Sequence, residues 1–147
     1  MEVPSGGTTT KITVPNPLYA YAFHPISLDD FQIDGESVSA NDPWIHWTST
    51  KRFPTNATDT AESQDNLVAE SLDRNRENMM QRTYQMLGMQ TEYLDVSNNM
   101  VKNRAEGGIP DSLESIHDTL HNAIGRGGHM YDAAYSAFDP MFWLLHA

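Results

Sequence analysis

Cysteine is absent from this chain of 147 residues. Disulfide bonds, cysteine-ligated zinc sites and thiol catalysis are therefore excluded within it, and any metal ion must be held by His, Asp or Glu side chains. Long apolar runs are also lacking, because no stretch approaches the ~20 residues that span a bilayer. The first residues, MEVPSGGTTT, lack the basic start and apolar core of a secretory signal. We therefore expect an intracellular protein without a membrane partner.

Basic residues are scarce: nine Lys and Arg stand against 20 Asp and Glu, which gives a formal net charge of −11 at pH 7. Nucleic acids and anionic membranes select clustered basic side chains, so neither is an expected partner. A solvated acidic surface is the simplest interpretation of this charge. Hydrophobic residues make up 39% of the chain, including three Trp and five Phe. That content is too high for a disordered chain and suits one domain with a core.

The first third of the chain predicts loops and aromatic packing. Residues 1–17 predict a loop, to which KITV at residues 11–14 adds a short strand. The aromatic stretch NPLYAYAFHP predicts an extended segment packed on a surface, and residues 26–43 predict turns. The tripeptide Asn56-Ala57-Thr58 fits the N-glycosylation sequon, but without a visible signal peptide we take that match as chance.

Two segments have the apolar periodicity of α-helices. The first is expected over residues 63–87, with Gly88 as its stop. The second is expected over residues 112–124, with Asp111 as its cap and Gly125 as its end, and the segment between the two predicts mostly loop. The apolar stripe of the first helix consists of Leu67, Val68, Leu72, Met79, Met80, Thr83, Tyr84 and Leu87. Its methionines are better explained as core filler than as soft copper ligands.

His117 and His121 lie four residues apart on the second expected helix. Residues at this spacing project from one helix face, so both imidazoles can point at one metal ion, and Glu114 shares that face. Two histidines with a purely structural role in the core can have the same spacing. Glu114 can alternatively form a capping box with Asp111. An opposing apolar stripe is expected to pack against the core; it consists of Leu113, Ile116, Leu120 and Ile124.

The same expected helix nearly matches a zinc-peptidase motif. That signature is H-E-x-x-H, in which the glutamate acts as general base. Here the sequence is H-D-x-x-H, and Asp118 is one methylene shorter than the glutamate it would replace. Its carboxylate would therefore lie at a different position relative to a metal-bound water. This makes a zinc peptidase a weaker interpretation, which stays open.

The end of the chain, AFDPMFWLLHA, adds a third histidine. Asp139 suits a helix cap and Pro140 suits a first helical turn, so a short helix beginning near residue 140 is expected to bring His146 toward the histidine pair. The glycines of GRGGHM allow the chain to turn back between the two helices. Three neutral imidazoles from two helices make a good site for copper or zinc.

Together, SLESIHDTLHNAIGRGGHM and AFDPMFWLLHA resemble the second copper motif of the tyrosinase and polyphenol oxidase family in its fungal form. The stretches VPNPLYAYAFHP and PWIHWTSTKRFP are similar to the segment between the two copper motifs of fungal tyrosinases. The resemblance covers nearly the whole chain. It implies a type 3 copper pair that oxidises monophenols and o-diphenols to o-quinones with O2, so a phenol and O2 are the expected partners.

The resemblance also implies roles for single residues. His117, His121 and His146 match the three ligands of the second copper. Phe142 matches the aromatic that packs against the ligand imidazoles. The family usually carries a histidine directly before the last ligand, where this chain has Leu145. That departure spares the ligand and removes a neighbour.

Two acidic residues match positions on the substrate side. Glu114 matches the acidic residue that helps hold a water near the phenol in tyrosinases, and it could act as general base. Asp118 stands where many active tyrosinases carry Asn. The aspartate adds negative charge near the substrate hydroxyl, so we expect diphenol oxidation more than monophenol hydroxylation. His24, His46 and His129 are not expected to be ligands.

The expected fold is mainly α-helical, a partial tyrosinase-type four-helix bundle with long loops. Residues 1–147 are expected to form one incomplete domain that holds one copper ion of the two in the family site, because the first-copper motif is not recognisable. Such a half-site predicts exposed apolar surface, little activity alone, and association with a first-copper fragment or with itself. A catechol oxidase-like or non-catalytic copper-binding relative is an alternative, and a zinc hydrolase is a weaker one.

Overall fold

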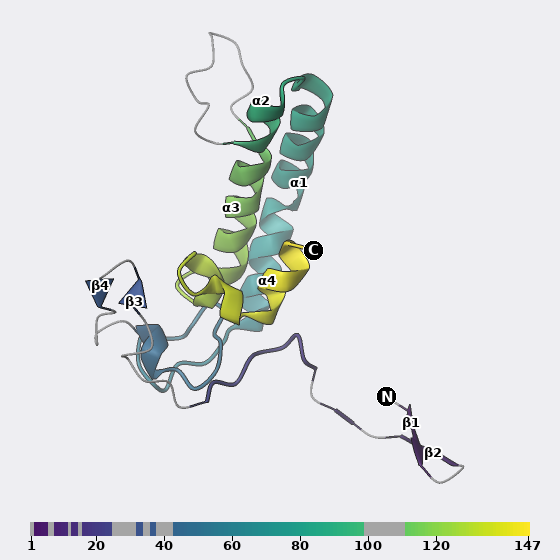
Figure 1. The fold of residues 1–147 in the computed structure, drawn as a ribbon, viewed down its shortest axis with the longest axis vertical. Helices are drawn as coiled ribbons and strands as arrows, with labels where there is room; N and C mark the ends of the chain where they lie inside the picture. Colours follow the sequence, from purple (N-terminus) through teal and green to yellow (C-terminus); the bar gives the residue numbers. More distant parts are fainter. Residues whose placement is uncertain are drawn as a thin grey trace.

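The computed structural model describes residues 2–5, 8–11, 13–14, 16–24, 32–33, 36–37, 43–98 and 111–147. The described chain is mainly helical, which confirms the expected fold class (Figure 1). Its helices are α1 (Asp65–Met89), α2 (Tyr93–Ser97), α3 (Leu113–Gly125) and α4 (Pro140–Leu145), with short 3-10 turns η2 (Pro43–His46), η3 (His129–Tyr131) and η4 (Ser136–Phe138). No helix among these residues is long and apolar enough to cross a membrane.

The strands among the described residues are short and form two antiparallel pairs. β1 (Glu2–Ser5) pairs with β2 (Thr8–Lys11), and β3 (Gln32–Ile33) pairs with β4 (Glu36–Ser37). The strand expected at residues 11–14 is therefore misplaced, since β2 ends where it was expected to begin. Most of residues 26–42, expected as turns, and residues 99–110, expected as loop, lie outside the described residues.

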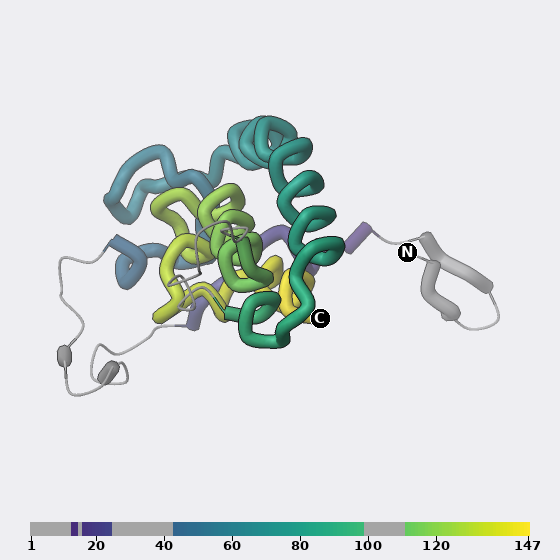
Figure 2. Tube along the Cα trace, turned by 90° about the horizontal axis from the view of Figure 1, so that it is seen from above, coloured from purple at the N-terminus to yellow at the C-terminus, as the bar shows by residue number. Residues whose placement is uncertain are grey.

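Helices α1 and α3 form the main packing unit. They run side by side in opposite directions, as Figures 1 and 2 show from two sides. The guanidinium of Arg82 on α1 donates to the Asp111 carboxylate, with Nη2 2.7 Å from Oδ1. It also donates to Ser115 and Thr119 at 3.0 and 2.9 Å. One α1 side chain therefore fixes the first two turns of α3.

The ends of both long helices differ from the sequence-based expectation. Ser112, not Asp111, is the N-cap of α3, and its hydroxyl accepts from the Ser115 amide at 3.2 Å. Asp111 is taken by the ion pair with Arg82, so the expected capping box of Asp111 with Glu114 is wrong in register. Gly125 lies inside α3, and Arg126 adopts the left-handed conformation (φ 32°) that closes the helix.

Helix α1 also runs further than expected. It continues through Gly88 to Met89, so this glycine does not stop the helix. A Cβ at Gly88 would meet no atom within 4 Å. The segment after it contains the one-turn helix α2 instead of only loop.

The core lies at the lower end of the helix pair in Figure 1. Trp44, Trp47 and Ala61 form a buried cluster, against which Tyr135 stacks with 4.7 Å between its ring centroid and that of Trp44. The aromatic segment is attached beside this core, because Ala22 forms a β-bridge with Ser49 and the Phe23 ring stacks on His129. The expected packing is present only in part, since Leu18, Tyr19 and Tyr21 are exposed. The core therefore joins the first third of the chain to the residues that follow α3.

Part of the expected apolar stripes is exposed. On α1, Met80, Tyr84 and Leu87 are 65%, 80% and 68% exposed, while Met86 is buried instead. On α3, Ile116 and Ile124 are buried as expected, but Leu113 is 58% exposed. Periodicity thus located the helices, while the apolar face of α1 near α2 remains open to solvent among the described residues.

Candidate metal centre

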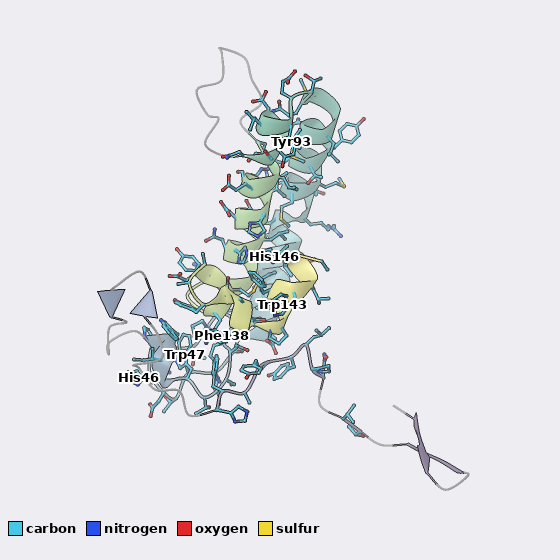
Figure 3. The ribbon with its side chains drawn as sticks, in the orientation of Figure 1. His46, Trp47, Tyr93, Phe138, Trp143 and His146 are labelled. Carbon is cyan, nitrogen blue, oxygen red and sulfur yellow. The ribbon has the colours of Figure 1, made fainter. Side chains whose placement is uncertain are left out.

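Three imidazoles converge between α3 and α4. His117 and His121 lie one turn apart on α3, and His146 is the C-cap residue of α4. The Nε2 atom of His117 lies 2.8 Å from that of His146 and 3.0 Å from that of His121. Figure 3 shows His146 turned from α4 toward the α3 helix. The three residues predicted from spacing and motif are therefore brought together.

The outer nitrogens of two rings are fixed by main-chain carbonyls. Nδ1 of His121 donates to the Met130 carbonyl oxygen at 2.7 Å, and Nδ1 of His146 donates to the Phe142 carbonyl oxygen at 2.6 Å. A carbonyl oxygen only accepts, so each of these Nδ1 atoms holds the proton. In the neutral form of each of these two rings, Nε2 then carries an unprotonated lone pair that faces the other rings. This is the tautomer that a metal-ligating histidine adopts.

The arrangement suits a cation. Lone pairs of neutral Nε2 atoms repel one another at 2.8–3.0 Å unless a proton or a metal ion lies among them. Two nitrogens bound at about 2.0 Å to one tetrahedral ion lie about 3.3 Å apart, close to the observed spacing. The candidate ligand atoms of the three residues all lie within 4.8 Å of one another. The donor set of three imidazoles fits copper or zinc better than magnesium or calcium.

The surroundings also keep the central ligand neutral. Burial lowers the pKa of His121 below its ordinary value, and positive charge on His117 or His146 would lower it further. The hydrogen bond to Met130 and the charge of Asp118 oppose this shift. Because a metal ion binds the neutral imidazole, a lowered pKa extends the pH range in which His121 is available as a ligand.

Phe142 lies against the His146 ring. The two rings stack with centroids 3.7 Å apart and planes 23° apart, and the Phe142 centroid is 6.0 Å from that of His121. The expected aromatic packing on the ligand imidazoles is thus present. Together with its carbonyl bond to Nδ1, this residue limits the rotation of His146 in two ways.

The two acidic residues lie in different places. Glu114 lines a cavity of about 650 Å³ on the open side of the cluster. Asp118 is exposed, and its Oδ1 lies 3.3 Å from Nδ1 of His117, the nitrogen that faces away from the cluster. A peptidase base would need to reach a water on the Nε2 side, so this position of Asp118 does not favour the peptidase interpretation. The cavity is lined by Ser97, Asn98, Leu113, Glu114, Ile116, His117, Leu120, Leu145 and His146.

Helix α4 is anchored by an ion pair that the sequence analysis did not find. The Asp139 carboxylate caps α4 by accepting from the Met141 amide at 2.9 Å, as the Asp-Pro pattern predicts. The same carboxylate is fully buried and accepts from Nε of Arg52 at 2.9 Å. Arg52 thereby holds the helix that carries His146. Arg52 and Asp139 are 87 positions apart, and no local pattern links them.

His129 has a different role from the three clustered residues. It is fully buried; its Nδ1 accepts from the Lys51 amide at 3.0 Å, and its ring stacks on Phe23 at 5.3 Å. Its Nε2 has no hydrogen-bond partner among the described residues. Burial lowers the pKa of His129 to about 4, so the ring is neutral at pH 7. His24 and His46 are exposed and lie outside the cluster.

The fold and the site define a helical protein with a cluster of three histidines that could hold a metal ion. The family model described as the common central domain of tyrosinase matches residues 1–147. Polyphenol oxidase 4 of Agaricus bisporus is 36% identical over 143 residues, which is 94% of this chain and 21% of that protein. The tyrosinase of Podospora anserina is 31% identical over 137 residues, 93% of this chain and 22% of that protein.

A solved structure of latent and active mushroom tyrosinase matches with a TM-score of 0.72 and 30% identity, over 99% of this chain and 35% of that one. The chain therefore belongs to the tyrosinase central-domain family, which confirms the resemblance found in the sequence. It spans about a fifth of the length of the curated relatives it matches.

Proposed function

We propose that this chain is the second-copper part of a copper oxidase of phenols, and that His117, His121 and His146 hold one copper ion. The observation that supports this most is the convergence of three Nε2 atoms whose outer nitrogens bond to carbonyls or lie beside a carboxylate. Membership of the tyrosinase family points to copper as the metal. A copper ion held there would supply the one-electron redox steps and the reaction with O2.

The remaining residues have supporting roles in this proposal. The cavity of about 650 Å³ beside His117 and His146 has room for a flat phenolic ring, and its leucine side chains suit the ring faces. The Glu114 carboxylate lines the same cavity and would accept the phenol proton, directly or through a water. Asp118 orients the His117 ring from its outer side.

We further propose that residues 1–147 act as one domain with a single copper position and that a second copper comes from elsewhere. Among the described residues, His117, His121 and His146 are the one group that can hold a metal in this way. Another part of a longer polypeptide, a first-copper fragment or a second copy of the chain could provide the other position. On this account the isolated chain oxidises neither monophenols nor o-diphenols at a significant rate.

Copper loading followed by an oxidase assay tests this proposal. The chain is loaded with copper, freed of excess metal, and assayed for o-diphenol oxidation and for copper content. We expect one copper per chain and negligible O2 consumption. Two coppers per chain with rapid quinone formation would contradict the half-site. Hydrolysis of a peptide or ester by the zinc-loaded chain, with none by the copper-loaded chain, would instead support a zinc hydrolase.

A further inference from the structure

The loop between the tryptophan core and α1 presents Asn56 to solvent. All residues from Thr55 to Thr60 are exposed. The loop is nevertheless held at its base, because the Thr55 amide donates to the Glu62 carbonyl at 3.0 Å and the Glu62 amide donates to the Thr55 hydroxyl at 3.1 Å. The indole Nε1 of Trp47 donates to the Thr58 carbonyl at 2.8 Å, which fixes the loop on the core.

The Asn56 side chain forms a tight turn with Thr58. Its Oδ1 accepts from the Thr58 amide at 2.8 Å and from the Thr58 hydroxyl at 2.6 Å. Its Nδ2 makes a contact of 3.4 Å with the Thr55 hydroxyl, at the outer limit of a hydrogen bond. Asparagine and threonine are thus joined through the oxygen of the amide, while the nitrogen has only the long contact with Thr55 in an exposed loop.

This geometry supplies what an N-linked glycan acceptor needs. Two hydrogen bonds to Oδ1 polarise the amide and make its N–H protons more acidic, which helps Nδ2 lose a proton as its new bond forms. The threonine hydroxyl makes one of these bonds, in line with the Asn-x-Ser/Thr rule. Ala57 at the middle position permits the turn, where a proline would not. We propose that Asn56 is an N-glycosylation site, modified by a lipid pyrophosphate-linked oligosaccharide when the chain enters the secretory compartment.

The reaction balances without a redox step. A bond forms between Nδ2 of Asn56 and the anomeric carbon of the first sugar, while the bond from that carbon to the pyrophosphate oxygen breaks. The lipid pyrophosphate leaves, and the amide nitrogen loses one proton. The turn is made by residues two positions apart, so it can form in the unfolded chain, where transfer to a growing polypeptide occurs.

The folded structure accommodates the modification. A glycan on Nδ2 of Asn56 would displace only the 3.4 Å contact to Thr55 and would extend into solvent. Trp47, which holds this loop, lies below the helices, away from His146 (Figure 3). The cavity beside the histidines would therefore stay open. The site is independent of the proposed copper chemistry.

Secretion of the full chain from a eukaryotic host tests the proposal. The chain is expressed behind a cleavable secretory signal, and protein is collected from the medium. We expect a mass increase that peptide N-glycosidase removes, and conversion of Asn56 to Asp with one 18O when that digestion is run in H2 18O. Asn56→Gln and Thr58→Ala should both abolish the modification, and Thr58→Ser should keep it.

A matched sequon elsewhere supplies the control. Asp132 also forms an exposed turn, in which its Oδ1 accepts from the Ala134 amide at 2.9 Å. Asp132→Asn combined with Ala134→Thr creates a second Asn-Ala-Thr there, far along the sequence from the first. Secreted protein in which this second sequon is modified and Asn56 is not would overturn the proposal. So would a glycan that persists in Thr58→Ala.

Discussion

Nδ1 of His121 donates to the carbonyl oxygen of Met130 at 2.7 Å, and this bond sets the direction of the central imidazole of the candidate metal centre. The carbonyl belongs to η3, which follows α3 after a turn through Gly127 (φ 84°). His121 lies on α3 and the carbonyl that orients its ring lies in η3, so these two elements must keep a fixed separation. Gly125, at the end of α3, lies so close to η3 that an added Cβ would meet the backbone of Met130 and Tyr131.

Gly125→Ala should weaken metal binding. A Cβ at Gly125 would lie 2.2 Å from the Tyr131 amide nitrogen and 2.5 Å from the Met130 carbonyl carbon, so the backbone that orients His121 must shift. Loss of such support typically lowers metal affinity about 10–100-fold. Competition with a chelator of known copper affinity measures this change.

Gly88→Ala is the matched control for that variant. Gly88 also lies in a helix, but a Cβ there meets nothing within 4 Å. The alanine should stabilise α1 by up to about 1 kcal/mol and leave copper affinity unchanged. Equal affinities of the Gly125 and Gly88 variants would show that the Met130 carbonyl does not set the His121 ring.

Arg52→Met should destabilise the whole fold. Asp139 is fully buried, and its carboxylate would lose the guanidinium that Arg52 provides. Removing one partner of a buried ion pair typically costs about 3–5 kcal/mol. Urea unfolding followed by tryptophan fluorescence measures the free energy of unfolding.

Arg74→Met provides the comparison, because Arg74 is exposed on α1 and donates to the Glu70 carbonyl. Its loss should change the free energy of unfolding by less than about 0.5 kcal/mol. A loss below 1 kcal/mol in the Arg52 variant would mean that the Arg52–Asp139 ion pair does not anchor α4.

The buried ring of His129 should make stability depend on pH. Its pKa of about 4 in the folded chain lies below the ~6.5 of an unfolded histidine. Between these values the unfolded chain binds a proton that the folded chain does not. The contribution of this ring to stability is therefore complete above pH 6.5 and is lost as pH falls, by about 1.4 kcal/mol per unit, until about pH 4.

Urea unfolding at pH 7 and pH 5 measures that slope. Other groups also titrate in this interval, so the comparison is with His129→Gln, which should show a shallower decrease. His24→Gln, at an exposed position, should keep the slope of the unchanged chain. Identical slopes for the two variants would rule out His129 as the cause.

The sequence predicted those features that depend on neighbouring residues. Asp139 and Pro140 predicted the start of α4, and the spacing of His117 and His121 placed both rings on one face of α3. The expected start of α4 also carried His146 toward that pair. Residue spacing alone left copper, zinc and a structural role open, and the family resemblance was needed to favour copper. Features that the sequence did not predict depend on contacts between residues far apart in the chain. The cap of α3 shifted to Ser112 because Asp111 pairs with Arg82, 29 positions earlier.

Exposure was the least predictable property. Met80, Tyr84 and Leu87 have helical spacing, and they form α1 as expected. Spacing reports that residues share a face and is silent about what covers it, so their exposure of 65–80% could not be foreseen from periodicity. Arg52 was missed for a similar reason, since its partner Asp139 lies 87 positions away.

Copper X-ray absorption of the loaded chain, with metal content measured on the same sample, shows which atoms bind the copper. We expect one copper per chain with three imidazole nitrogens at about 2.0 Å, and loss of that copper in His121→Ala but not in His24→Ala. Unchanged copper content in His121→Ala, or a first shell without imidazole nitrogens, would contradict the three-histidine centre.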